Sequence, residues 1–334
     1  MSALPPHPRE ALFGHEALRP PLPVVDHYCG VEARMRKSLA LQAELGPVFD
    51  ITLDAEDGAP IGGEAEHAHL IAEMANSSAN RFGRVGARVH PWRHAAFEAD
   101  VDTLVSRAGS RLAYLMIPKP ESAEDVERAV DAIDAACKRH GQPHLPLQVL
   151  IETHGALRDV FRIAAHPRIE SLSFGLMDFV SAHGGAIPKT AMELPGQFEH
   201  PLVVRAKLEI AAAAHACAKT PSHCVVTEFR DRERLAAAAR RAARDFGYTR
   251  MWSIHPDQIL PILDAFAPAA DEVEEAAELL LAAQAAQWAP MSFRDRLHDR
   301  ASYRYFWTVL ERAFRTGRPL PEAAREAFFP PSIG

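Results

Sequence analysis

Cysteine is scarce in this sequence, and the few cysteines are not paired by their spacing. The chain has four of them and no Cys-x-x-Cys motif: Cys29, Cys137, Cys217 and Cys224. Disulfide-stabilised domains and zinc knuckles need clustered cysteines. The spacing argues against both, and we interpret the four residues as small core residues.

Long apolar runs and an excess of basic residues are also missing. No stretch of roughly 20 apolar residues could span a bilayer, and the first ten residues lack the apolar core of a signal peptide. The net charge of -7 offers no basic stripe for nucleic acid. These absences predict a cytoplasmic protein whose partners are small molecules, with no membrane or nucleic-acid partner.

What the sequence does contain is a regular alternation of short apolar runs and long Ala-rich helical patterns. Eight such runs predict parallel strands that close into a (β/α)8 TIM barrel, an α/β fold; an open doubly wound sheet is the alternative. The expected strands cover residues 22–25, 49–53, 85–89, 114–117, 147–151, 171–175, 224–227 and 251–254. The clearest expected helices cover residues 31–45, 123–140, 202–219, 231–246 and 272–284.

We expect three parts in the chain: an N-terminal extension over 1–20, a barrel domain over 21–285 and a helical extension over 286–334. The tail has aromatic residues at helical spacing, which is typical of a helical hairpin packed on the barrel or on a neighbouring subunit. They are Tyr303, Tyr305, Phe306, Trp307 and Phe314. Between residues 178 and 201 lies a Gly- and Pro-rich segment, interpreted as a long loop that covers the substrate or as a solvated insertion.

Polar side chains gather at the carboxyl ends of the expected strands, which is the face where barrels place catalytic groups. They are Asp54, Glu56 and Asp57 after the second strand, Arg88 and His90 at the third, and Lys119, Glu152, Asp178, Glu228 and His255 after the fourth to eighth. Glu152 and Asp178 follow successive strands, so both can converge on one divalent cation. Pairing with arginine is the alternative for these two carboxylates.

Two of the other residues have structural interpretations as well. Arg88 could simply neutralise Glu56 or Asp57 in the mouth of the barrel. His255 precedes Pro256, so it could be a helix-start residue that makes a local hydrogen bond.

A series of short motifs in one order resembles the citrate lyase β-subunit family, which includes malyl-CoA lyases and is similar to pyruvate-class metal aldolases. A series of this kind is far more specific than any one motif. The matching segments are 50–57, 88–91, 117–122, 150–153, 174–178, Arg205, 254–259, 266–268 and 272–273, within residues 22–284. The resemblance implies a barrel enzyme that cleaves a carbon–carbon bond beside a carbonyl.

The resemblance also implies roles for individual residues. Glu152 and Asp178 would bind Mg²⁺, with Mn²⁺ as a substitute, and Glu56 and Asp57 would hold the waters of the metal. Arg88 would contact the keto acid and stabilise the developing charge. The substrate carboxylate would bind the metal held by Glu152 and accept hydrogen bonds from the backbone amides of Gly175, Leu176 and Met177. Further candidates are Lys119 and His255, and the tail residues Asp295 and Asp299 for a lid over a neighbouring site.

Spacing does not single out a proton shuttle among His90, His154, His183 and His255, and the CoA-facing segments depart from the family. The expected arginine-serine element is replaced by 23–30, and a usual lysine by 62–66. Two hypotheses therefore stand. One is a Mg²⁺-dependent lyase acting on a β-hydroxy acid or its CoA thioester, as a homo-oligomer that the resemblance suggests is a trimer or hexamer. The other is a non-catalytic metal-binding barrel that serves as a subunit or metabolite sensor.

Overall fold

A computed structural model describes residues 6–14 and 22–330, and their contacts divide the chain into two units. The first unit covers residues 22–266. The second combines the described residues of 1–21 with those of 267–330. The helix α12 (Ala270–Ala285) belongs by its contacts to the second unit, whereas the predicted barrel domain extended to residue 285.

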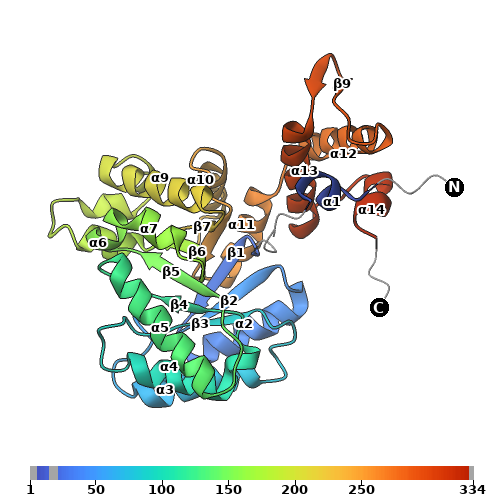
Figure 1. Cartoon of the computed structure of the whole chain (residues 1–334). Helices are drawn as coiled ribbons and strands as arrows, with labels where there is room; N and C mark the ends of the chain where they lie inside the picture. Colours follow the sequence, from blue (N-terminus) through green and yellow to red (C-terminus); the bar gives the residue numbers. More distant parts are fainter. Residues whose placement is uncertain (1–5, 15–21, 331–334) are drawn as a thin grey trace. The chain divides into compact units, whose positions relative to one another are not determined.

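The first unit is a closed barrel of eight parallel strands in sequence order, which confirms the predicted TIM-barrel class and rules out the open sheet (Figure 1). The strands are β1 (Val25–Cys29), β2 (Phe49–Asp54), β3 (Val85–Arg88), β4 (Leu115–Ile117), β5 (Leu147–Ile151), β6 (Ile169–Phe174), β7 (Thr220–His223) and β8 (Arg250–Ser253). The predicted positions of the first and seventh strands were wrong by three to four residues.

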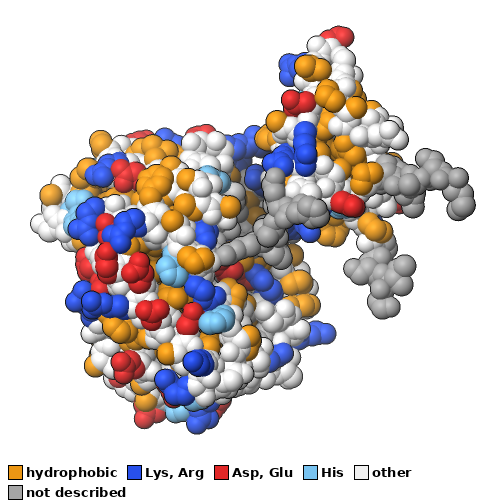
Figure 2. All heavy atoms as spheres, viewed as in Figure 1, with side chains coloured by type: hydrophobic (Ala, Val, Ile, Leu, Met, Phe, Trp, Pro, Cys, Tyr) orange, Lys and Arg blue, Asp and Glu red, His pale blue; other side chains and the backbone are white. Residues whose placement is uncertain are grey.

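Helices surround the barrel and connect successive strands (Figure 1). They are α2 (Glu32–Leu45), α3 (Glu64–Asn76), α4 (Phe97–Ala108), α5 (Ala123–Arg139), α6 (His154–Arg158), α7 (Val160–Ala165), α8 (Leu176–Ser181), α9 (Pro201–Ala216), α10 (Arg232–Arg244) and α11 (Ile259–Phe266). Side chains cap some of them: the Ser122 hydroxyl accepts a hydrogen bond from Asp125 N at 3.2 Å at the start of α5. Charges of both signs are mixed over the face of this unit seen in Figure 2.

The interior of the barrel is filled below the carboxyl end. At the amino end, the fully buried Arg250 guanidinium lies 2.5 Å from Asp50 Oδ2 and 3.1 Å from Asp26 Oδ2. Above this ionic layer is an apolar layer formed by Tyr114, Met116, Leu150 and Trp252. Because both layers are packed, a substrate can meet the barrel interior only at the carboxyl end.

Lys207 in α9 is buried on the outside of the barrel beside aromatic rings. Its Nζ donates to Gln197 Oε1 at 3.1 Å and lies 3.8 Å from the centre of the Phe198 ring. Burial lowers the pKa of Lys207 from 10.5 to about 8, so the folded chain binds this proton more weakly than the unfolded chain does. Protonated Lys207 therefore destabilises the fold below pH 8, and this cost disappears as the pH rises toward 10.5.

The variant Lys207→Met is expected to remove this pH dependence. Relative to the variant, the wild-type chain should gain about 3 kcal/mol of unfolding free energy between pH 7 and pH 10.5, at about 1.4 kcal/mol per pKa unit. Urea unfolding of both chains across this range measures the difference. The exposed Lys189→Met substitution is the control. A difference between wild type and Lys207→Met that does not change with pH would mean that Lys207 titrates normally.

The second unit has a small helical core of its own. It contains α1 (Pro8–Phe13), α12, α13 (Arg300–Arg315) and α14 (Glu322–Phe328), with the antiparallel pair β9 (Met291–Phe293) and β10 (Arg296–His298) between α12 and α13. Tyr303 and Trp307 are buried in this core, whereas Tyr305 and Phe314 are exposed. The aromatic residues therefore mark a packed helix face only in part. In neither unit does a described helix have the length and apolar character that crossing a membrane requires.

Candidate active site

Arg88 has a fixed orientation at the carboxyl end of the barrel. Its Nε and one terminal nitrogen donate to the two carboxylate oxygens of Asp54, at 2.7 and 2.9 Å. Its other terminal nitrogen lies 2.8 Å from Glu56 Oε2, and the Tyr28 ring lies 4.8 Å from the guanidinium carbon. Asp54 and Arg88 are register partners on β2 and β3, which explains the pairing. The buried guanidinium is therefore a rigid cation at this edge.

Asp54 was named among the polar residues at the strand ends, but nothing in the sequence indicated a role for it. Besides Arg88, its carboxylate accepts hydrogen bonds from the backbone N–H groups of Glu56 at 3.0 Å and Gly58 at 2.5 Å. A Cβ on residue 58 would lie only 2.3 Å from Asp54 Oδ2, so glycine is required for the loop to wrap around this carboxylate. These contacts satisfy a fully buried anion and make Asp54 the residue that positions Arg88.

Lys119 joins the acidic side chains around the mouth. Its Nζ lies 2.6 Å from Glu56 Oε1, 2.7 Å from Asp57 Oδ2 and 3.5 Å from Asp178 Oδ1. Burial opposes the charge of Lys119, but the hydrogen bonds to Asp57 and Glu56 outweigh it and raise the pKa of the ammonium group. Asp57 is thus paired with Lys119. Glu56 and Asp57 were both considered as partners for Arg88, and of these two the structure pairs Glu56 with Arg88.

Glu152 is a buried carboxylate directly after β5. Its Oε1 accepts a hydrogen bond from Lys119 N at 2.9 Å. A Cβ on residue 175 would lie 2.1 Å from Glu152 Oε2, so Gly175 leaves the room that this carboxylate occupies. Burial raises the pKa of Glu152 to about 8, and the negative charges of Asp178 and Glu56 add to the rise, against the opposing effect of Arg88. The site therefore concentrates negative charge that a bound cation would stabilise.

Asp178 lies in the first turn of α8 with its side chain 40% exposed, facing the ammonium group of Lys119. The preceding residues Gly175, Leu176 and Met177 were predicted to offer amides to a substrate carboxylate. The Gly175 N–H donates to Ile151 O at 3.2 Å, so that amide is already occupied within the protein. Gly175 therefore has a steric role beside Glu152, and amide binding stays a prediction for Leu176 and Met177.

The donor set fits Mg²⁺ better than a transition metal. Among the described residues, no three His, Cys, Asp or Glu side chains are grouped as a complete metal site. Magnesium, however, keeps several waters and is commonly bound through one or two carboxylates. Glu152 and Asp178 provide that number. Burial and the negative charge of Asp178 raise the pKa of Glu152, and a cation bound by both carboxylates would offset these effects. Arg88 directs its donors to Asp54 and Glu56, which weakens the alternative that arginine pairing replaces the metal.

The four candidate histidines have structural contacts. His255 caps the short helix η4 (Pro256–Gln258) by accepting from Asp257 N at 3.2 Å, as its structural interpretation proposed. His90 Nδ1 lies 2.6 Å from Asp100 Oδ2. His154 and His183 contact the backbone oxygens of residues 182 and 179. Together with Arg205, which pairs with Glu209, these last two line a separate cavity of about 480 Å³. No contact identifies one histidine as the proton shuttle.

The two tail candidates have local positions in the second unit. Asp295 lies in the turn between β9 and β10 with a positive φ of 61°. Asp299 caps α13, because its carboxylate accepts from the N–H groups of Ala301 at 3.0 Å and Ser302 at 3.3 Å. This geometry gives Asp299 a structural role, while a lid function for either residue stays a prediction.

Asp299→Ala is accordingly expected to reduce the unfolding free energy of the second unit by about 1 kcal/mol, the usual cost of losing a helix N-cap. Turnover by the folded chain should be unchanged. Urea unfolding and steady-state kinetics measure the two effects, with Glu326→Gln, at an exposed position of α14 in the same unit, as the control that removes one negative charge without removing a cap. A large loss of turnover from Asp299→Ala in the folded protein would instead support the lid.

The closed parallel barrel, with a buried centre of carboxylates and an arginine at its carboxyl end, defines the class of protein: a TIM barrel with an enzyme-like site at its catalytic face. The sequence matches the HpcH/HpaI aldolase/citrate lyase family over residues 49–256. The chain belongs to this family, so the predicted family is confirmed. The predicted enzyme class, a carbon–carbon lyase, is confirmed with it.

Individual relatives support the assignment. An L-malyl-CoA/β-methylmalyl-CoA lyase of Cereibacter sphaeroides is 31% identical over 280 residues, covering 79% of this chain and 86% of the relative. A crystal structure of a citrate lyase from Burkholderia xenovorans LB400 is 54% identical, covers 97% of this chain and 99% of that chain, and has a TM-score of 0.83. A Mycobacterium tuberculosis protein, solved with magnesium, acetoacetate and coenzyme A, shares the fold at 21% identity and a TM-score of 0.67, over 88% and 98% of the two chains.

Proposed function

We propose that this chain is a Mg²⁺-dependent lyase that cleaves a β-hydroxyacyl-CoA thioester into a short aldehyde or keto acid and a shorter acyl-CoA. The main support is the buried Arg88, which donates two hydrogen bonds to Asp54 and lies at the same end of the barrel as Glu152. A guanidinium in this position suits the carboxylate or the oxygen of the leaving carbonyl. The thioester part of the proposal is supported by the names of relatives, which act on malyl-CoA.

Glu152 and Asp178 would hold the Mg²⁺ ion, and Mn²⁺ would substitute for it. Glu56 and Asp57 lie within reach of Lys119 on the same rim and would bind the waters around the ion. The bound ion supplies positive charge to the substrate oxygens. The exposure of Asp178 leaves that side of the pair open to a substrate.

The cleavage itself transfers one proton and shifts two electron pairs, those of the O–H bond and of the bond between the α and β carbons. The β-hydroxyl loses its proton and becomes the new carbonyl, the adjacent carbon–carbon bond breaks, and its electron pair enters the thioester enolate, which then takes up a proton. Arg88 stabilises the negative oxygen during this change, and because the burial of Arg88 excludes water, its charge acts strongly. The packed layers of the barrel keep bulk water away from the reacting carbons from below.

The proposal is tested by incubating the purified chain and Mg²⁺ with malyl-CoA, β-methylmalyl-CoA, citramalyl-CoA and citryl-CoA. A lyase releases a carbonyl product that phenylhydrazine traps, together with an acyl-CoA that still contains its thioester. Free CoA without a trapped carbonyl would instead make the chain a thioesterase, as another relative, the (3S)-malyl-CoA thioesterase of Cereibacter sphaeroides, is named. Metal binding with no reaction on any substrate, free hydroxy acids included, would favour the non-catalytic barrel.

Subunit association belongs to the same proposal. The family resemblance of the chain suggests a homo-oligomer, either a trimer or a hexamer. The exposed aromatic side chains of Tyr305 and Phe314 on α13 are candidates for subunit contact. Light scattering coupled to size-exclusion chromatography measures the mass directly.

A further inference from the structure

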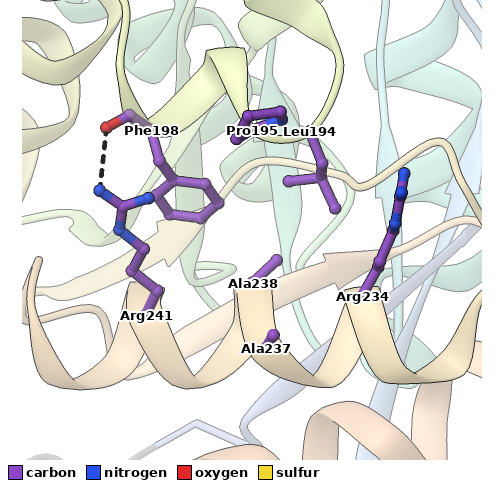
Figure 3. Close-up of a pocket in the computed structure, with 7 residues that line it drawn as sticks. All are labelled: Leu194, Pro195, Phe198, Arg234, Ala237, Ala238 and Arg241. Atoms are coloured by element: carbon purple, nitrogen blue, oxygen red, sulfur yellow. Dashed lines mark hydrogen bonds between the residues drawn. The ribbon is translucent and has the colours of Figure 1, made fainter.

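A cavity of about 450 Å³ lies between α10 and the segment that connects α8 to α9 (Figure 3). The described residues that line it are all different from those of the candidate active site. Its floor is formed by Ala237 and Ala238, and its opposite wall by Leu194, Pro195 and Phe198. This size is in the range of small-molecule sites, which are mostly apolar with a few polar groups. The cavity therefore has the size and the apolar surface of a ligand site.

Among the described residues, the charged ones that line this cavity are two arginines, Arg234 and Arg241, at opposite ends of the alanine floor (Figure 3). They are seven residues apart on one helix, a distance of about 10 Å along the axis at 1.5 Å per residue. Neither is held in a two-pronged ion pair: Arg234 Nε lies 3.4 Å from Asp231 Oδ2, and Arg241 Nε lies 3.7 Å from Asp245 Oδ2. Both guanidinium groups keep donors for another anion.

The wall opposite the helix is preformed. Leu194 N donates to Glu228 Oε1 at 2.9 Å, and the turn at Gly196 is so close to Thr190 O that a Cβ there would lie 2.0 Å away. The Phe198 carbonyl accepts from Arg241 at 3.3 Å, and the Phe198 ring is buried against Lys207. A wall fixed by these contacts needs little ordering when a ligand binds, which favours affinity.

We propose that this cavity binds a linear aliphatic dicarboxylate, with its methylene chain along Ala237 and Ala238 and one carboxylate at each arginine. Apolar contact along the floor and charge at both ends match this ligand class, whereas a monocarboxylate would leave one guanidinium unused. The proposal concerns a second site and is independent of the reaction at Arg88 and Glu152.

Isothermal titration calorimetry of the full chain with suberate tests the site. The wild-type chain should bind suberate more tightly than octanoate, which has one carboxylate, and than succinate, which is too short to reach both arginines. The double variant Arg234→Gln, Arg241→Gln should raise the Kd for suberate about tenfold, because it removes both ion pairs. Arg240→Gln, on the same helix but outside the cavity lining, makes the same charge change once and should leave the Kd unchanged.

A second variant tests the cavity without changing its charge. Ala237→Phe fills the floor at a position that is exposed to solvent, so it should block suberate while circular dichroism shows an intact fold. The proposal is overturned if wild type shows no saturable suberate binding, or if the double variant binds suberate as wild type does, which would assign binding to another anion site such as Arg88. Equal affinity for octanoate and suberate would also overturn it, because the second arginine would then play no part.

Discussion

Replacing Arg88 with lysine is expected to reduce kcat by about 10² to 10³-fold, the loss typical of removing one group that stabilises a developing oxyanion. Lysine keeps the positive charge, but its ammonium group cannot donate in parallel to both oxygens of Asp54 while it also meets Glu56. The charge would therefore lose its fixed position. Turnover of the active CoA thioester, measured with phenylhydrazine, gives the value.

The split between kcat and KM separates positioning from simple binding. If Arg88 acts mainly in the transition state, kcat and kcat/KM should fall together. Asp54→Asn should reproduce part of this loss, because the amide can accept only one of the two guanidinium hydrogen bonds. Arg93→Lys is the matched control, since Arg93 is exposed and pairs with Asp125, which is not among the acids of the candidate site. An Arg88→Lys variant with wild-type kcat and a raised KM would limit Arg88 to substrate capture.

The alternation of apolar runs and helices was sufficient to predict the barrel, because parallel strands buried on both faces have continuous apolar sequences. It misplaced two strands for physical reasons. β1 is almost entirely buried, but it contains Asp26, whose charge is neutralised by the distant Arg250, so its sequence does not look apolar. β7 contains Pro221 and polar neighbours, and the β-branched run that follows it lies past the strand end. In both cases long-range pairing outweighed local pattern.

The site was predictable as far as strand ends determine it. Glu152, Arg88 and Lys119 lie together because the carboxyl ends of a parallel barrel converge. Residue spacing could not reveal which charged side chains pair. Arg88 pairs with Asp54, and the backbone of Lys119, with a positive φ of 48°, directs its side chain toward the acidic residues. Such pairing depends on side-chain distances across three strands, which no one-dimensional pattern contains. The hairpin of β9 and β10 was missed because its strands have only three residues each.

Glu152→Gln is expected to abolish Mg²⁺ binding and with it turnover. The amide still accepts the hydrogen bond from Lys119 N, so the variant should fold. Because burial and neighbouring acids raise the pKa of Glu152 from 4.5 to about 8, the metal-free fold loses stability as the pH rises from 4.5 to 8, and the full cost persists above pH 8. Without magnesium, the variant should therefore be at least as stable as wild type at pH 8 and above.

Magnesium is expected to reverse this order of stability, because it stabilises wild type and not Glu152→Gln. At an Mg²⁺ concentration of 100 times its Kd, wild type should gain about 2.7 kcal/mol of unfolding free energy, whereas Glu152→Gln should gain nothing. Asp178→Asn should lose the same gain, and Glu66→Gln, an exposed acid in the first turn of α3, should retain it. Calorimetry of Mg²⁺ binding and urea unfolding with and without the metal give independent values. A Glu152→Gln chain stabilised by magnesium as wild type is would move the metal away from this pair, and the raised pKa of Glu152 would then report only its burial beside Asp178 and Glu56.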